Sequence, residues 1–272
     1  MYSTTTLVKN SRFNGRYIGT HQRIDLAAHH VLVEAITKQE YFPTGKEIIY
    51  FEGTRGPDGL KRKSPGEDEP SHIWSDSPDG RDVKKLIYDY RHNLVAALRV
   101  DDREKAAREA AWMAHMVTDA LTPAHHYPLG EEKKRLMTGD EMMTVFGAPM
   151  KGLMKGRNWR ETWKNNWQYW GFSGGMSQHI SYEYGVLMLV ASIPIKKLIP
   201  KVNIEKFRQV DFEEEFLHAI EKMKSLQIYE DFVAKGWTVG LVYKTRDQLL
   251  PMIIEMVALG WYSALQESQR KG

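Results

Sequence analysis

The sequence predicts an all-α fold, a single-domain multi-helix bundle with long loops. Apolar residues recur at helical spacing over several long stretches, and no stretch carries a convincing strand pattern. The 272 residues suffice for one large domain with a substantial core. A third observation is that several helices begin or end at recognisable signals, such as the proline that follows Ala120.

The first third of the chain predicts two helices separated by a long irregular segment. Thr20 is a candidate N-cap for an amphipathic helix over His21–Thr37. Residues Lys38–Asp82 hold glycine, proline and many charges, and their only short β-like run is Ile48–Phe51. So long a loop inside a compact domain is usually functional or disordered. We expect the second helix over Arg81–Val100.

The rest of the chain predicts further helices. An Ala-rich stretch with apolar residues at helical spacing predicts a central helix that Pro123 terminates. A Met-rich, then Trp-rich region follows, and apolar periodicity resumes after it. The predicted helices are Arg103–Ala120, Ser177–Ile193, and those within Ile204–Lys235 and Lys244–Arg270.

Composition excludes some classes of site and partner. The formal net charge of +3 is too small to imply a nucleic-acid partner by itself, and the absence of cysteine excludes disulfides and thiolate metal sites. Residues 1–20 lack the apolar core of a signal peptide, so the chain as written is expected to be cytoplasmic, or secreted if a leader precedes this numbering. The apolar runs Val186–Ile195 and Leu249–Trp261 are interpreted as buried helices.

Three side chains around the end of the central helix suit a divalent cation. His115 and Asp119 are four residues apart and therefore share one helix face, and His125 follows where the chain turns back. Two imidazoles and a carboxylate are ligands that zinc accepts. By itself, such a pair is more often a surface ion pair, or a core histidine satisfied by a carboxylate.

Further candidate ligands strengthen the metal interpretation. His179 and Glu183 form a second helical pair, the long loop contributes Asp58 and His72, and His21 opens the first helix. Sites with adjacent metal ions combine imidazoles with a bridging carboxylate, so the long loops are expected to lie around a clustered metal site. His92 and His218 fit no cluster and are expected to be surface or core residues.

These residues carry a resemblance to a known superfamily. The motif His115-Met116-Val117-Thr118-Asp119, followed by Pro123-Ala124-His125, resembles the hallmark His-Tyr-x-(Gly/Thr)-Asp…Pro-x-His of the zinc-dependent phospholipase C and single-strand-specific nuclease superfamily. The upstream Asp58 and His72, the downstream His179 and Glu183, and Thr20-His21 at a helix start match the family order. The resemblance spans roughly residues 20–190.

The resemblance implies an all-α fold that binds two to three Zn²⁺ ions and hydrolyses phosphodiesters. Asp58, His72, His115 and Asp119 would hold the first metal, and Asp119 would bridge to a second that also takes His21. The third would be held by His125, His179 and Glu183. Several cations suit this chemistry because the transition state gathers negative charge on the phosphoryl oxygens, and a metal-activated water would attack. Asp58 is the candidate for orienting or deprotonating that water.

Two departures from the family pattern concern the metal site and the chain length. Secreted family members supply an N-terminal tryptophan as a zinc ligand, but no tryptophan precedes Trp74 here. Asp25, one helical turn after His21, either fills that position or orients His21 from outside the metal. The distance between His125 and His179 along the chain is longer than in compact bacterial phospholipases, so the 1–272 domain is expected to carry an insertion at approximately 129–176.

The insertion contains a stripe of tryptophans on a basic helix. Trp159, Trp163, Trp167 and Trp170 recur at helical spacing. The stripe either docks the helix onto the domain, or makes peripheral membrane contact, or stacks on nucleic-acid bases. The leading hypothesis is therefore a zinc-dependent phospholipase C-like hydrolase with a phospholipid or other phosphodiester substrate. The alternatives are a single-strand nuclease or nucleotidase, for which nucleic acid is the substrate, and a non-catalytic helical protein with a structural metal.

Overall fold

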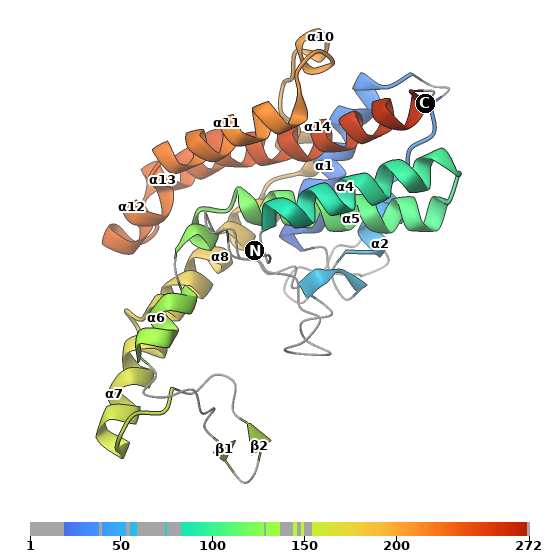
Figure 1. The fold of residues 1–272 in the computed structure, drawn as a ribbon. Coiled ribbons are helices and arrows are strands. Elements are labelled where there is room, and N and C mark those ends of the chain that lie inside the picture. Colours follow the sequence, from blue (N-terminus) through green and yellow to red (C-terminus); the bar gives the residue numbers. More distant parts are fainter. Residues whose placement is uncertain are drawn as a thin grey trace. The chain divides into compact units, whose positions relative to one another are not determined.

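The computed structural model describes residues 19–37, 40–52, 55–58, 74, 83–127, 129–136, 144–145, 148–149 and 154–270. Helices account for nearly all the regular structure of these residues, which confirms the all-α class (Figure 1). The chain separates into two compact units, residues 1–126 with 185–272, and residues 127–184. The second unit contains the predicted insertion, 129–176, and extends past it at both ends.

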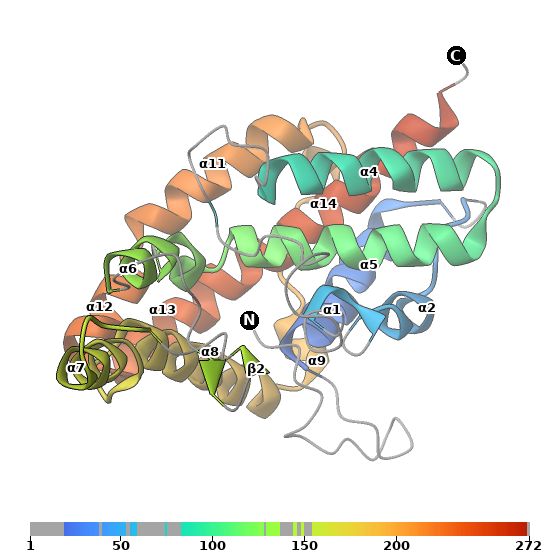
Figure 2. The same cartoon turned by 60° about the horizontal axis from the view of Figure 1, so that its bottom comes forward.

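The scaffold of the first unit is an antiparallel hairpin of α4 (Val83–Arg99) and α5 (Arg103–Ala120), which pack along their length (Figure 2). The side chain of Asp102 caps α5 by accepting a hydrogen bond from the Lys105 amide at 3.1 Å. The predicted central helix is therefore confirmed with the same bounds, and the second predicted helix, Arg81–Val100, is confirmed over Val83–Arg99.

Helix α14 (Leu250–Gln269) packs against both arms of the hairpin and provides much of the core. The indole of Trp261 is fully buried and donates a hydrogen bond to the Ala110 carbonyl at 2.9 Å. At the other arm, Arg91 donates to Ser263 at 2.9 Å and pairs with Glu267 at 2.8 Å. These contacts hold α14 on the hairpin through both polar and apolar groups.

The remaining elements of the first unit surround this three-helix core. Helix α1 packs on α14, α5 and the short α2, and α11 packs on α14. A 3-10 turn, η3, follows α5, and a π-helical turn, η4, precedes α14. Their bounds are α1 Thr20–Ala35, α2 Gly45–Tyr50, η3 Pro123–His126, α9 Ile195–Leu198, α10 Ile204–Phe207, α11 Phe212–Ser225, α12 Ile228–Lys235, α13 Val239–Lys244 and η4 Thr245–Leu249.

Two predictions for the start of the chain were wrong in detail. Gly19, and not Thr20, is the N-cap of α1, and its amide is satisfied by the side chain of Gln22 at 3.0 Å. The β-like run Ile48–Phe51 is largely helical, because Thr44 and Glu47 form a capping box that nucleates α2.

The predicted apolar run Leu249–Trp261 is confirmed as largely buried. The run Val186–Ile195 is only partly buried, with Met188 48% exposed, and its helix ends at Ser192. Most of α14 is inside the core, and Val186 and Val190 of α8 (Gly175–Ser192) are buried. By length and composition, one run in the described part of the chain, Val239–Gln269, could cross a membrane. Since 72% of its apolar window is buried inside the protein, it has the character of a core helix.

The second unit consists of helices α6 (Leu129–Leu136) and α7 (Trp159–Trp170), the first half of α8, and one small antiparallel ribbon. The ribbon pairs β1 (Thr144–Val145) with β2 (Ala148–Pro149). Helix α7 packs on α6, and Asn165 donates a hydrogen bond to the Leu136 carbonyl at 2.5 Å. Gly175 lets the chain pass close to Glu132, whose carboxylate would lie 2.1 Å from an added Cβ.

Candidate metal centre

Helix α5 places His115 and Asp119 together in the interior. The two side chains are 0% and 1% exposed, and Nε2 of His115 lies 3.3 Å from Oδ2 of Asp119. Their four-residue spacing brings both onto the buried face of α5, where alanines fill the neighbouring positions. The surface ion pair considered as an alternative is therefore excluded for these two residues.

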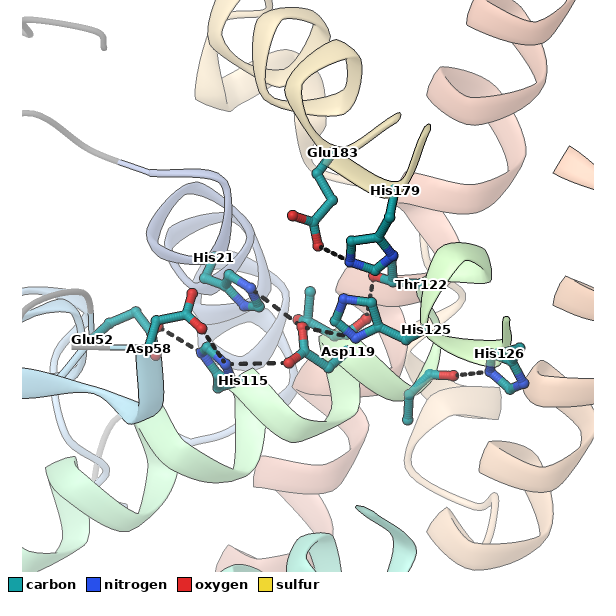
Figure 3. A network of polar contacts seen from close by, with 12 residues as sticks. His21, Glu52, Asp58, His115, Asp119, Thr122, His125, His126, His179 and Glu183 are labelled. Atoms are coloured by element: carbon teal, nitrogen blue, oxygen red, sulfur yellow. Dashed lines mark hydrogen bonds and ion pairs between the residues drawn. The ribbon is translucent and has the colours of Figure 1, made fainter. Parts of the chain in front are cut away.

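The Asp119 carboxylate lies between three imidazoles from different elements. Its Oδ1 is 3.4 Å from Nε2 of His21 on α1 and 3.6 Å from Nδ1 of His125 on η3, whereas its Oδ2 faces His115 (Figure 3). Burial alone would raise the pKa of Asp119, but the surrounding positive charge, including His125 and His115, holds it well below its usual value. A carboxylate with an imidazole beside each of its oxygens is suited to bridge two cations that those imidazoles also bind.

His21 and His115 are stacked against each other. Their ring centroids are 4.1 Å apart with an interplanar angle of 8°. Burial, followed by the charge of His115, lowers the pKa of His21 well below its usual value, and Asp119 opposes this shift. The neutral imidazole that results is the form that binds metal ions.

Glu52 is part of the cluster, although no sequence motif marks it as a ligand. It is 2% exposed, and its Oε1 lies 2.8 Å from Nδ1 of His115. Ligand atoms of His21, Glu52 and His115 all lie within 4.8 Å of one another, so this group could hold a metal ion. Burial alone would lower the pKa of His115, but Glu52, Asp119 and Asp58 outweigh it and raise that pKa well above its usual value.

Asp58 reaches the same cluster from the segment 55–58. Its Oδ1 lies 3.8 Å from Nε2 of His115, and its side chain is 20% exposed, more than the other acids of the cluster. Burial alone would raise the pKa of Asp58, but His115 and His21 outweigh it and lower the pKa to about 2. Asp58 is therefore a carboxylate at neutral pH and lies at the more accessible side of the cluster.

Asp25 is a buried acid of the same neighbourhood. It is 1% exposed, and neither carboxylate oxygen has a hydrogen-bond partner among the described residues. Burial and then Glu52 raise its pKa well above the usual value, with His115 acting in the opposite direction. Asp25 therefore does not orient His21 through a hydrogen bond, which was one of the two roles considered for it.

The donor set fits a cluster of divalent cations. Carboxylates from four acids surround three imidazoles, and the carboxylates of Asp25 and Glu52 retain oxygens that have no hydrogen-bond partner within the described part of the chain. Buried carboxylates are costly unless they are paired or coordinate a metal. Imidazole nitrogens together with carboxylate oxygens, without thiolates, suit zinc among the common metals.

The 3-10 turn η3 fixes the position of His125. The amide of Trp74 donates to the His125 carbonyl at 3.0 Å, and the Trp74 ring stacks on His126 at 5.6 Å. Nε2 of His126 lies 2.7 Å from the Ala120 carbonyl, so this histidine stabilises the end of α5. The neighbouring histidines His125 and His126 thus have different environments.

The other predicted ligands lie elsewhere in the chain. His179 and Glu183 are an i, i+4 pair on α8 in the second unit, with Nε2 and Oε1 3.2 Å apart (Figure 3). His72 lies outside the described residues. His92 and His218 are exposed, as predicted for residues outside the site.

No protein-family model matches this chain, and no curated protein or solved structure is detectably similar to it.

Proposed function

We propose that the protein is a zinc-dependent phosphodiester hydrolase of the phospholipase C type. The observation that carries this proposal is the Asp119 carboxylate, which has His21 and His125 at one oxygen and His115 at the other. A single carboxylate shared in this way supports a cluster of adjacent cations more than a lone structural ion.

The described residues divide naturally between two adjacent metal positions. His115, Asp58 and Oδ2 of Asp119 would hold the first ion, with His72 as a further ligand from the sequence pattern. His21 and Oδ1 of Asp119 would hold the second. For a third ion, the resemblance implies His125, His179 and Glu183 as ligands.

Glu52 would fix the tautomer of His115. With its proton on Nδ1, His115 can donate a hydrogen bond to Oε1 of Glu52. This tautomer leaves a lone pair on Nε2, which faces Asp58 and Asp119. The choice of nitrogen matters because Nε2 is the atom that faces the other proposed ligands. Glu52 is in this proposal a positioning residue.

Bound zinc would supply Lewis-acid stabilisation of the phosphoryl oxygens and lower the pKa of water. Asp58 would contribute at the accessible side of the cluster by accepting a hydrogen bond from the attacking water. Its pKa of about 2 makes it a weak proton acceptor, so orienting the water is favoured over deprotonating it. The buried acids Asp25 and Asp119 would balance the cationic charge.

The test is hydrolysis by protein purified without chelator or affinity metal. Three substrates separate the hypotheses: a choline phospholipid in detergent micelles, single-stranded DNA, and the soluble bis(p-nitrophenyl) phosphate. We expect cleavage of the phospholipid and of the soluble diester, loss of both with EDTA, and recovery on adding zinc. Cleavage of DNA without phospholipid would favour the nuclease alternative, and no cleavage by zinc-loaded protein would favour the non-catalytic one.

A further inference from the structure

Helix α7 of the second unit turns its tryptophans away from the protein. Trp159, Trp163, Trp167 and Trp170 are 74, 65, 60 and 41% exposed, although large aromatic side chains usually bury most of their surface. Their spacing places them on one narrow stripe of the helix. Phe172, just beyond the helix end, is 99% exposed and extends the same apolar surface, which we call the tryptophan face.

A different side of α7 makes the packing contacts, and it does so largely with polar groups. Asn165 and Tyr169 are buried, and Asn166 exchanges hydrogen bonds with the backbone of Met154 at 2.8 and 3.0 Å. The Gly156 amide donates to the Thr162 hydroxyl at 2.9 Å. The tryptophans are thus not needed to dock α7 in its unit, and a helix with its polar side inward and its apolar side outward presents that side to a partner.

Cations accompany the tryptophan face. Between residues 154 and 175 the chain carries Lys155, Arg157, Arg160 and Lys164 against the single acid Glu161. Glu161 is paired with Arg157 at 3.0 Å, and the guanidinium of Arg160 lies 5.4 Å from the Trp159 ring centroid. The net charge of this surface is therefore positive, and it complements an anionic partner.

We infer that the tryptophan face is a membrane-binding surface for bilayers that contain anionic phospholipids. Tryptophan is favoured at the boundary between lipid and water, and basic side chains beside it attract anionic headgroups. A helix with this face would lie in the plane of the interface, with Phe172 inserted at its end. The surface would bind a bilayer and is distinct in its residues from the metal ligands.

The ring geometry argues against single-stranded nucleic acid as the partner. Trp163 and Trp167 stack on each other, with centroids 5.5 Å apart and an interplanar angle of 10°. Each ring therefore has one of its two faces partly covered by its neighbour. A base-stacking platform needs open aromatic faces on which bases can stack, and this pair has few such faces. Insertion into a lipid interface needs only ring edges and apolar area, which the pair does have.

The test is co-sedimentation of the full chain with vesicles. Vesicles of phosphatidylcholine alone are compared with vesicles of phosphatidylcholine and phosphatidylserine, and a single-stranded oligonucleotide is tested in parallel. The variant Trp163→Ala/Trp167→Ala is matched by Tyr50→Ala/Tyr243→Ala, which removes two aromatic rings that are 47 and 51% exposed elsewhere. The charge variant is Arg160→Gln/Lys164→Gln.

We expect the wild type to bind the anionic vesicles and the tryptophan variant to lose at least about tenfold in partition coefficient. The charge variant should lose about tenfold on anionic vesicles and little on neutral ones. The matched tyrosine variant should bind like the wild type. Absence of vesicle binding by the wild type, equal binding by the tryptophan variant, or tryptophan-dependent binding of the oligonucleotide alone would overturn the inference.

This inference does not rest on hydrolysis. The binding assay is run in EDTA as well as in zinc, with vesicles of a non-hydrolysable diether lipid, so that turnover plays no part. Failure of the proposed function would appear as lost cleavage of bis(p-nitrophenyl) phosphate with vesicle binding intact. Failure of the membrane inference would appear as absent vesicle binding with cleavage of bis(p-nitrophenyl) phosphate intact.

Discussion

Oε1 of Glu52 lies 2.8 Å from Nδ1 of His115, and both side chains are buried in the first unit. This contact joins Glu52, two residues beyond the end of α2, to the C-terminal half of α5. It leaves the other ring nitrogen of His115 facing Asp58 and Asp119, at 3.8 and 3.3 Å. Because outer carboxylates orient metal-binding imidazoles, Glu52 should control zinc affinity without being required for it.

The first prediction concerns substitutions of Glu52. Glu52→Gln keeps an oxygen that can accept the Nδ1 proton of His115 but removes a charge, so zinc affinity should fall about tenfold, and Glu52→Ala should lower it about a hundredfold. Competition with a chromophoric chelator measures both dissociation constants. Wild-type affinity in both variants would show that Glu52 has no role in metal binding.

The sequence located most of the helices and the central ligands for physical reasons that are local. The spacing of His115 and Asp119 fixes their shared face once α5 is a helix, and Asp102 and Pro123 mark its two ends. The Thr44–Glu47 capping box is an equally local signal, and it outweighs the β-branched residues that follow it. The capping box predicts a helix where Ile48–Phe51 alone suggests a strand.

Other features depend on tertiary contacts that no local pattern encodes. Glu52 carries no motif, and only the packing of α2 on α5 brings it to His115. Likewise, the spacing of Trp163 and Trp167 gives a stripe but not its direction, which is decided by the buried contacts of Asn165 and Tyr169 on a different side. From the sequence alone, three roles for the stripe therefore stay open: docking, membrane contact and base stacking.

The second prediction concerns Asp25 and pH. The pKa of Asp25 is raised above its ordinary value of 3.8, so the folded metal-free protein binds this proton more tightly than the unfolded chain. Its contribution to stability is therefore lost as the pH rises from about 3.8 toward the raised pKa. Asp25→Asn removes this effect and should therefore be more stable than the wild type in the metal-free state at pH 7.

Urea unfolding in EDTA at several pH values tests this expectation. The free-energy difference between Asp25→Asn and the wild type should be small near pH 4 and increase toward pH 7. A difference that does not change with pH would mean that the ionisation of Asp25 has no net effect on folding. Asp89→Asn, on the exposed surface of α4, serves as the control and should change stability by less than about 0.5 kcal/mol.

The third prediction concerns the bridging carboxylate. Asp119→Asn cannot neutralise two cations, so it should abolish hydrolysis and remove the stabilisation that zinc provides. For the wild type, saturating zinc should raise Tm by about 5–10 °C relative to the EDTA-treated protein. Differential scanning calorimetry of both proteins, with and without zinc, measures these shifts. Full activity, or an undiminished zinc-dependent shift in Asp119→Asn, would refute the clustered-metal account.

The fourth prediction separates the two proposed surfaces. Trp163→Ala should leave kcat/KM for bis(p-nitrophenyl) phosphate unchanged, because the stripe contributes no metal ligand. The same variant should reduce the rate on phospholipid vesicles severalfold, because fewer molecules are bound to the lipid surface. Initial rates on the two substrates provide the comparison. An equal loss on both would place Trp163 in the folding or chemistry of the active site.

The metal content of the purified chain tests the central claim most directly. Protein prepared without chelator or affinity metal is analysed by elemental mass spectrometry, with Asp119→Asn prepared in parallel. We expect two to three zinc ions per chain in the wild type and a clear loss of zinc in the variant. No bound zinc in the wild type, even after incubation with excess zinc and removal of the unbound ions, would contradict it.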